Sequence, residues 1–140
     1  MTQFAFVMTG SRVDCDDLVA EAFARSWRAL AEGEIRDPGS YLRRVIVNEV
    51  ARRRRWARLV PLRHGRVEPA RFEDSHAERD GLLQALDLLP ARQRAVVVLR
   101  YWEDLSEART AEVLGISVGA VKSHAHRGLG RLRAILEDRQ

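Results

Sequence analysis

The chain has 140 residues, of which 46% are apolar and 31% charged, with a formal net charge of +4. This length suits one ordinary domain or two small ones, and the apolar share is sufficient for a packed core. No apolar run approaches the roughly 20 residues that span a bilayer, and the N-terminus lacks the basic segment of a secretory signal. The single cysteine, Cys15, excludes an internal disulfide. We therefore expect a cytoplasmic protein with no membrane association, in which Cys15 is a partly buried helix residue.

The charged residues are distributed unevenly along the chain. Residues 1–35 carry a net charge of −3 and residues 36–58 a net charge of +6. Residues 79–116 come to −1 and residues 117–140 to +3. An acidic or nearly neutral block is thus followed twice by a basic one. This alternation predicts two modules, each with an end that faces nucleic acid.

The N-terminal module is predicted to contain two helices. Asp14 is the expected N-cap of the first, which runs to about Leu30. Its apolar residues recur at helical spacing. They are Leu18, Val19, Ala22, Phe23 and Trp27. Asp37 is the expected N-cap of the second helix, because Pro38 follows it and suits a first helical position. This helix extends to about Leu59.

A face of the second predicted helix carries polar and basic side chains away from its apolar positions. It presents Arg44, Asn48, Arg52 and Arg55. The run 52–55 is four consecutive arginines, which cover every side of a helix, so some of them are simply solvated. Trp56 offers a flat ring beside them, and an aromatic side chain among arginines suits unstacked, single-stranded bases. For Trp56, core packing and base contact remain equal alternatives, whereas Trp27 and Trp102 are expected in the core.

The rest of the chain is predicted to form a linker and a second helical module. Residues 60–77 combine Pro, Gly and mixed charges without a sustained period, which is typical of a flexible linker. Helical spacing resumes at about residue 78, and further helices are expected over 91–103, 106–114 and 118–137. The predicted fold is therefore all-α, with two small helical domains over residues 1–59 and 78–140 joined by the linker.

The strongest local pattern is that of a helix-turn-helix. Ala111 is small where two helices would cross, and Gly115, four residues later, suits a turn with positive φ. Val121, six residues further on, would pack the second helix against the first, and Ser117 is its expected N-cap. An ordinary helical hairpin is the alternative, but the agreeing spacings and the basic C-terminal tail argue against it.

The second helix of this motif would enter the major groove of DNA with its N-terminal half. The side chains expected to contact DNA are Ser117, Val118, Ala120, Lys122, Ser123, His126, Arg127 and Arg131. Lys122 and Arg127 could also hold phosphates, which position a protein without specifying sequence. His124 and His126 are expected to be solvated surface histidines rather than a metal pair. No catalytic constellation, phosphate-binding glycine loop or metal cluster is recognisable, so we expect no enzyme, no cofactor and no small-molecule substrate.

Three segments, in order, resemble sigma factors of the extracytoplasmic-function class (group IV of the sigma-70 superfamily). These are 16–27, then Tyr41–Asn48 with the arginine run, then Leu88–Arg94 with the helix-turn-helix. The resemblance implies a protein that directs core RNA polymerase to promoters and melts them, with core polymerase and promoter DNA as partners. It also allows an anti-sigma factor, which no residue here identifies.

Site residues follow from this resemblance segment by segment. Docking on polymerase is implied for Asp17, Leu18, Glu21, Phe23 and Trp27. Contact with the −10 element is implied for Arg44, Asn48, Arg52, Arg55 and Trp56, together with the loop 31–36. Reading of the −35 element is implied for the second helix of the helix-turn-helix.

The chain departs from the family pattern at several points. The family usually has more sequence before the point matching Phe4, so the first domain is expected to be short at its N-terminus. Ala20 replaces a frequent Gln, Thr110 a common apolar residue, and His124 a frequent Arg.

Two other functions compete with this interpretation. A stand-alone helix-turn-helix regulator would explain the C-terminal module, but it leaves 16–27 and the arginine-rich helix without a role. A polymerase-binding relic that cannot melt DNA would explain a shortened first domain.

Overall fold

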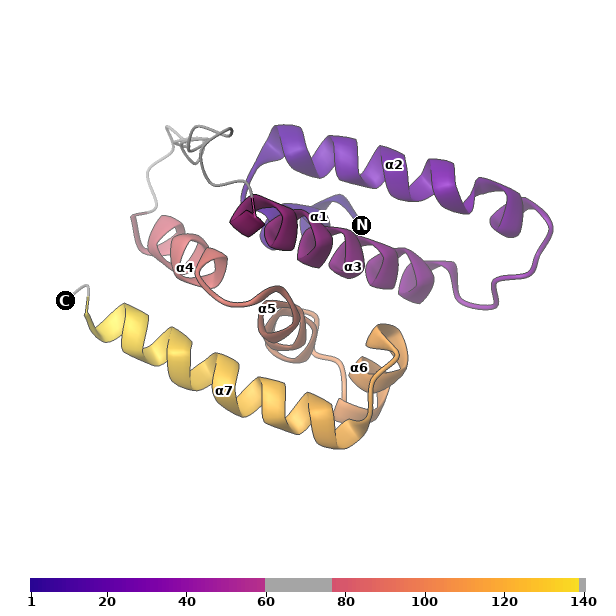
Figure 1. Ribbon diagram of the computed structural model, residues 1–140. Helices are drawn as coiled ribbons and strands as arrows, with labels where there is room; N and C mark the ends of the chain where they lie inside the picture. Colours follow the sequence, from indigo (N-terminus) through magenta and orange to yellow (C-terminus); the bar gives the residue numbers. More distant parts are fainter. Residues whose placement is uncertain (60–76, 139–140) are drawn as a thin grey trace.

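The computed structural model describes residues 1–59 and 77–138, and in these ranges the chain forms helices and no strand (Figure 1). The predicted linker lies almost entirely outside the described residues. The helices are α1 (Thr2–Thr9), α2 (Arg12–Ala31), α3 (Pro38–Leu59), α4 (Ala77–Asp87), α5 (Ala91–Val97), the π-helical turn η1 (Val98–Trp102), α6 (Glu107–Leu114) and α7 (Val118–Glu137). The all-helical prediction is confirmed.

Local capping explains where the N-terminal helices begin and end. Helix α1, which the sequence analysis did not predict, ends at Gly10, whose φ of 73° only glycine adopts without strain. Ser11 is the N-cap of α2 and accepts a hydrogen bond from the Asp14 amide at 3.3 Å. The prediction that Asp14 is this cap was therefore wrong by three residues. Asp37 does cap α3, accepting from the Ser40 amide at 3.3 Å.

The C-terminal helices follow the predicted order with one irregularity. The helix expected over 91–103 is α-helical only to Val97 and continues as the π-helical turn η1. Single-turn π-helices are rare, and no periodicity in the sequence announces one. Glu103, at the end of η1, donates its amide to the Val98 carbonyl at 3.0 Å.

Helix α2 buries a narrower stripe than its apolar pattern predicts. The buried positions are Cys15, Leu18, Ala22 and Ser26, which recur every three to four residues. Phe23 is 44% exposed and Trp27 70% exposed, since both lie beside this stripe rather than in it. The expectation that Trp27 and Trp102 belong to the core was wrong, because Trp102 is 48% exposed. Trp56 is also exposed.

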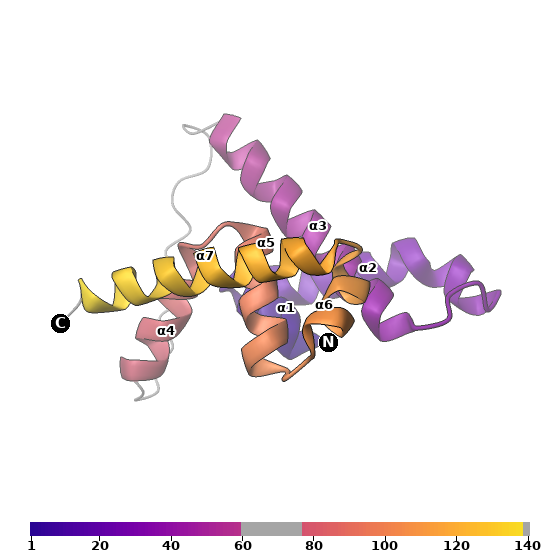
Figure 2. The same cartoon turned by 90° about the horizontal axis from the view of Figure 1, so that it is seen from below.

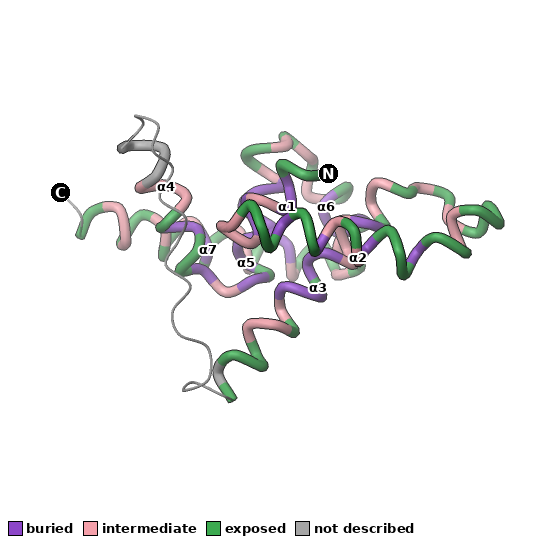
Figure 3. The backbone as a smooth tube through the Cα atoms, turned by 90° about the horizontal axis from the view of Figure 1, so that it is seen from above, coloured by how far each residue is buried: buried purple, intermediate pink, exposed green. Residues whose placement is uncertain are grey.

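One apolar core joins the N-terminal helices to the C-terminal ones. It contains side chains of α1, α2 and α3 as well as side chains of α4, α5, η1 and α6, and includes Phe4, Met8, Ile46, Val50, Leu89, Val97, Leu99 and Val113. Figure 3 shows the buried positions of both halves of the chain meeting in the middle of the molecule. Residues 1–59 and 77–138 are therefore packed together in this structure.

A glycine on α7 permits this helix to approach α5 closely. A Cβ atom at Gly128 would lie 2.8 Å from Val97 Cγ2 and 3.4 Å from the Gln93 carbonyl oxygen. At Gly130, two residues further along α7, nothing lies within 4 Å of such an atom.

These two glycines provide a matched test of that approach. Gly128→Ala is expected to lower the free energy of unfolding by about 1–3 kcal/mol, because overpacking outweighs better helix propensity. Gly130→Ala is expected to raise it by up to about 1 kcal/mol. Urea denaturation of the two variants measures both changes, and equal stabilisation by both would contradict the close packing of α5 on α7.

Candidate nucleic-acid interface

Helices α6 and α7 form the predicted helix-turn-helix. Gly115, between them, has a φ of 67° and donates its amide to the Ala111 and Glu112 carbonyls at the end of α6. Ala111 is 7% exposed and Val121 is fully buried, and they pack together with Val96 of α5. Ser117 caps α7 and accepts from the Ala120 amide at 3.0 Å. The predicted turn at Gly115, crossing at Ala111 and Val121, and N-cap at Ser117 are confirmed.

The outer face of α7 is open to solvent over the length that would enter a groove (Figure 2). Of the residues predicted to contact DNA, only Ala120 is half-buried, and the exposed ones are Ser117, Val118, Lys122, Ser123, His126, Arg127 and Arg131. Lys122 Nζ lies 3.8 Å from Glu107 Oε2 on α6, while its side chain stays 66% exposed. The Ser117 hydroxyl is committed to capping the helix.

Three of the four consecutive arginines on α3 contact other parts of the protein. Arg52 and Arg53 both bind Glu49 on their own helix, with Arg52 Nε 3.0 Å and Arg53 Nε 3.2 Å from its carboxylate. Arg54 donates to the Leu89 carbonyl at 2.6 Å. Arg55 is exposed and forms no ion pair within the ranges that the structure describes. The expectation that some of the run is merely solvated applies to Arg55 alone.

Glu49 is a functional neighbour of this run that sequence reasoning missed. Its side chain is 3% exposed and is surrounded by Arg25, Arg52 and Arg53. The hydrogen bond from Arg52 lowers the pKa of Glu49 most, to about 2, and burial opposes that shift. Glu49 is the one acidic residue between Arg44 and Arg52 in the sequence, and this isolated position could have indicated its role as a partner of the arginines. Arg52 therefore forms an ion pair with the buried Glu49 carboxylate and is also a predicted DNA contact.

The predicted −10 residues of α3 divide into two groups. Asn48, Arg52, Arg55 and Trp56 are exposed and lie along one side of the helix. Arg44 points instead at the end of α6, where its Nε lies 3.1 Å from the Val113 carbonyl oxygen. Its Nη2 lies 2.5 Å from the Glu112 carbonyl oxygen. In this structure Arg44 is therefore occupied by the helix-turn-helix.

Comparison with known proteins decides which family this arrangement belongs to. The family "Sigma-70 region 2" matches residues 1–59, and the family "Sigma-70, region 4" matches residues 79–132. The RNA polymerase sigma-E factor of Streptomyces antibioticus is 43% identical over 133 residues, which cover 91% of this chain and 73% of the relative. The ECF RNA polymerase sigma factor SigL of Mycobacterium tuberculosis is 30% identical over 97% of this chain and 82% of the relative. The chain belongs to the RNA polymerase sigma factors.

Solved structures agree with the fold of this sigma factor. CnrH, in complex with the cytosolic domain of CnrY, matches with a TM-score of 0.64 and 28% identity over 99% of this chain and 81% of CnrH. RpoE of Bartonella quintana, in complex with the anti-sigma factor NepR, matches with a TM-score of 0.70 and 22% identity. That match covers 97% of this chain and 89% of RpoE.

The sigma factor presents an aromatic and acidic face on α2. Phe23 and Trp27 lie four residues apart and therefore share a side of the helix. Asp17 is exposed, whereas Glu21 is bound by Arg25 at 2.7 Å and Arg53 at 2.9 Å. Leu18 is 1% exposed, so it supports the helix from the core and is not available to a partner here. Its implied docking role stays a prediction.

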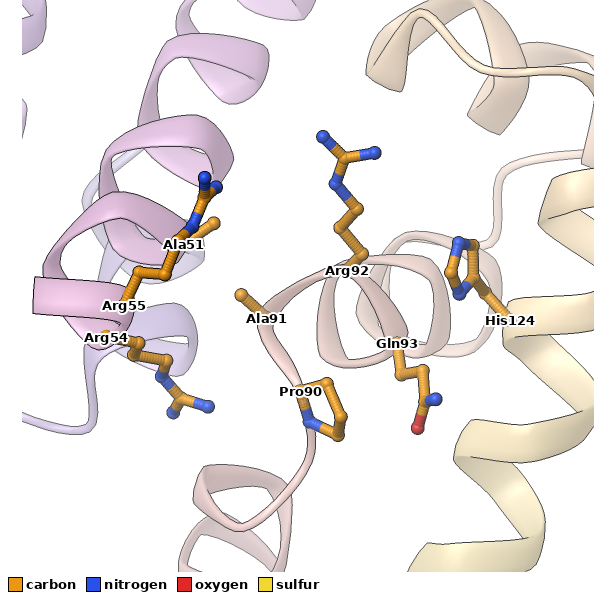
Figure 4. Close-up of a pocket in the computed structure, with 8 residues that line it drawn as sticks. All are labelled: Ala51, Arg54, Arg55, Pro90, Ala91, Arg92, Gln93 and His124. Carbon is orange, nitrogen blue, oxygen red and sulfur yellow. The ribbon is translucent and has the colours of Figure 1, made fainter. Parts of the chain in front are cut away.

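A basic cleft of about 260 Å³ lies between α3, α5 and α7 (Figure 4). Arg54 and Arg55 line it from α3, Arg92 from α5 and His124 from α7. Burial, followed by the charges of Arg92 and Arg127, lowers the pKa of His124. Its Nδ1 atom is buried and has no hydrogen-bond partner among the residues that the structure describes. The expectation of a solvated histidine holds for the exposed His126 but was wrong for His124.

Other features of the described residues bear on alternative functions. Thr110 is fully buried at the crossing of the helix-turn-helix, and its hydroxyl has no hydrogen-bond partner within residues 1–59 and 77–138. Across residues 1–59 and 77–138, no cluster of three or more His, Cys, Asp or Glu side chains is arranged to hold a metal ion. No helix in these ranges is long and apolar enough to cross a membrane. Cys15 is buried, as expected.

Proposed function

We propose that this sigma factor directs core RNA polymerase to promoters by reading the −35 element with α7 and the −10 element with α3. The observation that carries the proposal is the exposed face of α7 in an intact helix-turn-helix. A helix in that position offers its N-terminal side chains to the major groove. Lys122 lies early enough on α7 to reach base edges, and Arg127, five residues later, lies nearer the phosphate backbone.

The role of α3 is proposed from its exposed side. Asn48, Arg55 and Trp56 combine an amide, a cation and a flat ring, which suit the stacking and backbone contacts of an opened strand. Arg52 belongs to the same side and is oriented by Glu49. Arg44 would join this surface once it leaves α6. The domain boundaries proposed for these roles are residues 1–59 and 78–140.

Core polymerase is the proposed partner of α2. Large aromatic side chains such as Phe23 and Trp27 are seldom left exposed side by side unless a partner covers them. A stand-alone regulator that only binds duplex DNA gives this face no role. We propose in addition that the protein acts in the cytoplasm, is not itself a catalyst, and has an anti-sigma factor as a further partner.

Run-off transcription with purified core polymerase tests the proposal on a panel of promoters that differ by single bases in the −35 element. Lys122→Ala is expected to relax preference at one position, at a cost of about 1–3 kcal/mol. Arg127→Ala should weaken all promoters alike and reduce the slope of log affinity against log salt by about one unit.

The same assay includes a binding arm without polymerase. Tight, sequence-specific duplex binding by the free chain, with no transcription when core polymerase is added, would favour the stand-alone regulator. Preference profiles and salt slopes identical to wild type in both variants would show that α7 does not read the groove in this way.

A further inference from the structure

The cleft of about 260 Å³ between α3, α5 and α7 has two chemically different parts (Figure 4). Toward α3, the side chains of Arg55 and Arg92 stand on opposite sides of it. Toward α7, it is lined by the amide of Gln93 and the imidazole of His124. The described residues that line the cleft include no Asp or Glu, so no carboxylate among them neutralises the arginines.

The arginines at the cleft differ in what they already bind. Arg54 donates to the Leu89 carbonyl at 2.6 Å and to the Asp87 carbonyl at 3.0 Å, so its guanidinium is committed to the end of α4. Arg55 and Arg92 are exposed and form no ion pair with any residue that the structure describes. Like charges that share a partly covered cleft repel each other unless an anion lies between them. Arg55 and Arg92 are therefore the two arginines that can take an anion here.

A phosphate group is the anion that suits this pair of arginines. A guanidinium presents its N–H groups as a planar fork, which matches two oxygens of a phosphate. Arg55 comes from α3 and Arg92 from α5, so the two forks can bind different oxygens of one phosphate. Burial and the charges of Arg92 and Arg127 lower the pKa of His124, so its imidazole is neutral at pH 7 and offers one donor and one acceptor.

Two polar atoms in the wall of the cleft have no partner among the described residues. Gln93 is 7% exposed, and its Oε1 atom accepts no hydrogen bond there. The Nδ1 atom of His124 is buried in the same condition. Buried polar atoms in native proteins nearly always have a partner, and leaving one without a partner costs free energy. Both atoms would be satisfied by a ligand that brings hydroxyl groups into the cleft.

The volume of the cleft limits the size of this ligand. A water molecule occupies about 30 Å³ in the liquid, so one bridging water does not fill 260 Å³. Sites for drug-sized ligands and cofactors range from about 300 to 1,000 Å³, so a dinucleotide is too large. A molecule the size of a phosphorylated sugar lies between these limits. Ala51, Pro90 and Ala91 add an apolar wall for its carbon skeleton.

We propose that this cleft binds a small phosphate ester with free hydroxyl groups, whose phosphate lies between Arg55 and Arg92 and whose hydroxyl groups bind Gln93 and His124. The backbone of DNA supplies the same anionic oxygens, but it has no hydroxyl group for the buried Gln93. The site shares only Arg55 with the proposed −10 surface. The proposal goes beyond the sigma-factor role, and its test requires neither polymerase nor promoter.

Ribose 5-phosphate and inorganic phosphate are the probes for this site. Each is titrated into the full-length chain at constant ionic strength, and the thermal unfolding midpoint is followed, because a ligand that binds the folded state raises it. Both probes are expected to raise the midpoint, ribose 5-phosphate at the lower concentration. Arg92→Ala is expected to weaken both about ten- to hundredfold, because it removes charge-assisted hydrogen bonds to the phosphate.

Three further variants separate the parts of the site. Gln93→Met keeps an unbranched side chain without the amide, so it should leave binding of inorganic phosphate unchanged and weaken ribose 5-phosphate to the same affinity. Arg133→Ala removes an equal charge from an exposed position of α7 outside the cleft, so both probes should bind it as they bind wild type. If Arg92→Ala does not fold by circular dichroism, Arg55→Ala removes the opposite arginine and should weaken both probes.

The remaining outcomes decide against the site without touching the sigma-factor role. An unchanged midpoint with both probes, or equal weakening by Arg92→Ala and Arg133→Ala, would overturn the proposal. A single-stranded DNA oligonucleotide tests the other source of phosphate, and Arg92→Ala is expected to leave its binding as in wild type. If ribose 5-phosphate does not bind and the oligonucleotide loses affinity in Arg92→Ala, the cleft contacts a DNA backbone and the small ligand is excluded.

Discussion

Replacing both Phe23 and Trp27 with alanine is expected to weaken binding to core RNA polymerase at least a hundredfold. Exposed aromatic residues at the centre of an interface commonly contribute 2 kcal/mol or more each, and about 1.4 kcal/mol corresponds to a tenfold change in affinity. The free energy of unfolding should change little, because the two side chains are 44% and 70% exposed in the free protein. Fluorescence titration of labelled protein with core polymerase measures the loss.

Trp56→Ala is the matched control for this experiment. Trp56 is also an exposed tryptophan, at 59%, but it lies on α3 and is proposed to contact DNA rather than polymerase. Its replacement should leave binding to free core polymerase near wild type and reduce promoter opening. Unchanged polymerase binding in the Phe23 and Trp27 double variant would remove α2 as the docking face.

Glu49→Gln is expected to destabilise the protein by about 3 kcal/mol at pH 7. The carboxylate has a pKa of about 2 in the folded chain against an ordinary value of 4.5, and each pKa unit corresponds to 1.36 kcal/mol. Because the folded pKa is the lower one, the contribution is fully present above about pH 4.5 and is lost as the pH falls through about 2. The glutamine side chain keeps the shape but loses the charge that holds Arg52 and Arg53.

Urea denaturation at several pH values checks both the size and the direction of this effect. The difference between wild type and Glu49→Gln should be constant from pH 7 to about 5 and should shrink below pH 4.5. Glu32→Gln removes a carboxylate from an exposed position at the end of α2, so it should cost little at any pH. A difference that grows as the pH falls would contradict the assigned pKa.

Short-range rules predicted the helix-turn-helix well. The residues that define the motif contact partners close to them in the sequence, so their spacing alone is sufficient to predict their roles in the turn, the helix crossing and the N-cap. They are Ala111, Gly115, Ser117 and Val121. The N-cap at Asp37 was predicted for the same reason. Helix α1 was not predicted, because it is short and because its core residues Phe4 and Met8 pack against helices that come later in the chain.

The arginines show where sequence reasoning ends. Arg44, Arg54 and Arg94 are alike as residue types, and each finds its partner from 7 to 86 residues away along the chain. A count of basic residues predicts a surface for nucleic acid, and that prediction cannot distinguish an exposed guanidinium from one that satisfies a helix end. Glu49 was missed because its burial depends on the packing of α2 against α3.

The attachment of α1 has a consequence for exchange of backbone amide hydrogens. A helix of eight residues has almost no stability in isolation, and the last carbonyls of α1 are satisfied partly by Arg94 from the other half of the chain. Whenever the halves separate, α1 loses that cap and the part of its apolar cover that α4 and α5 supply, and it keeps only its packing on α2 and α3. Its amides should then exchange with deuterium at the rate of this opening, well before those of α2 and α3, so α1 reports a movement that takes place elsewhere in the molecule.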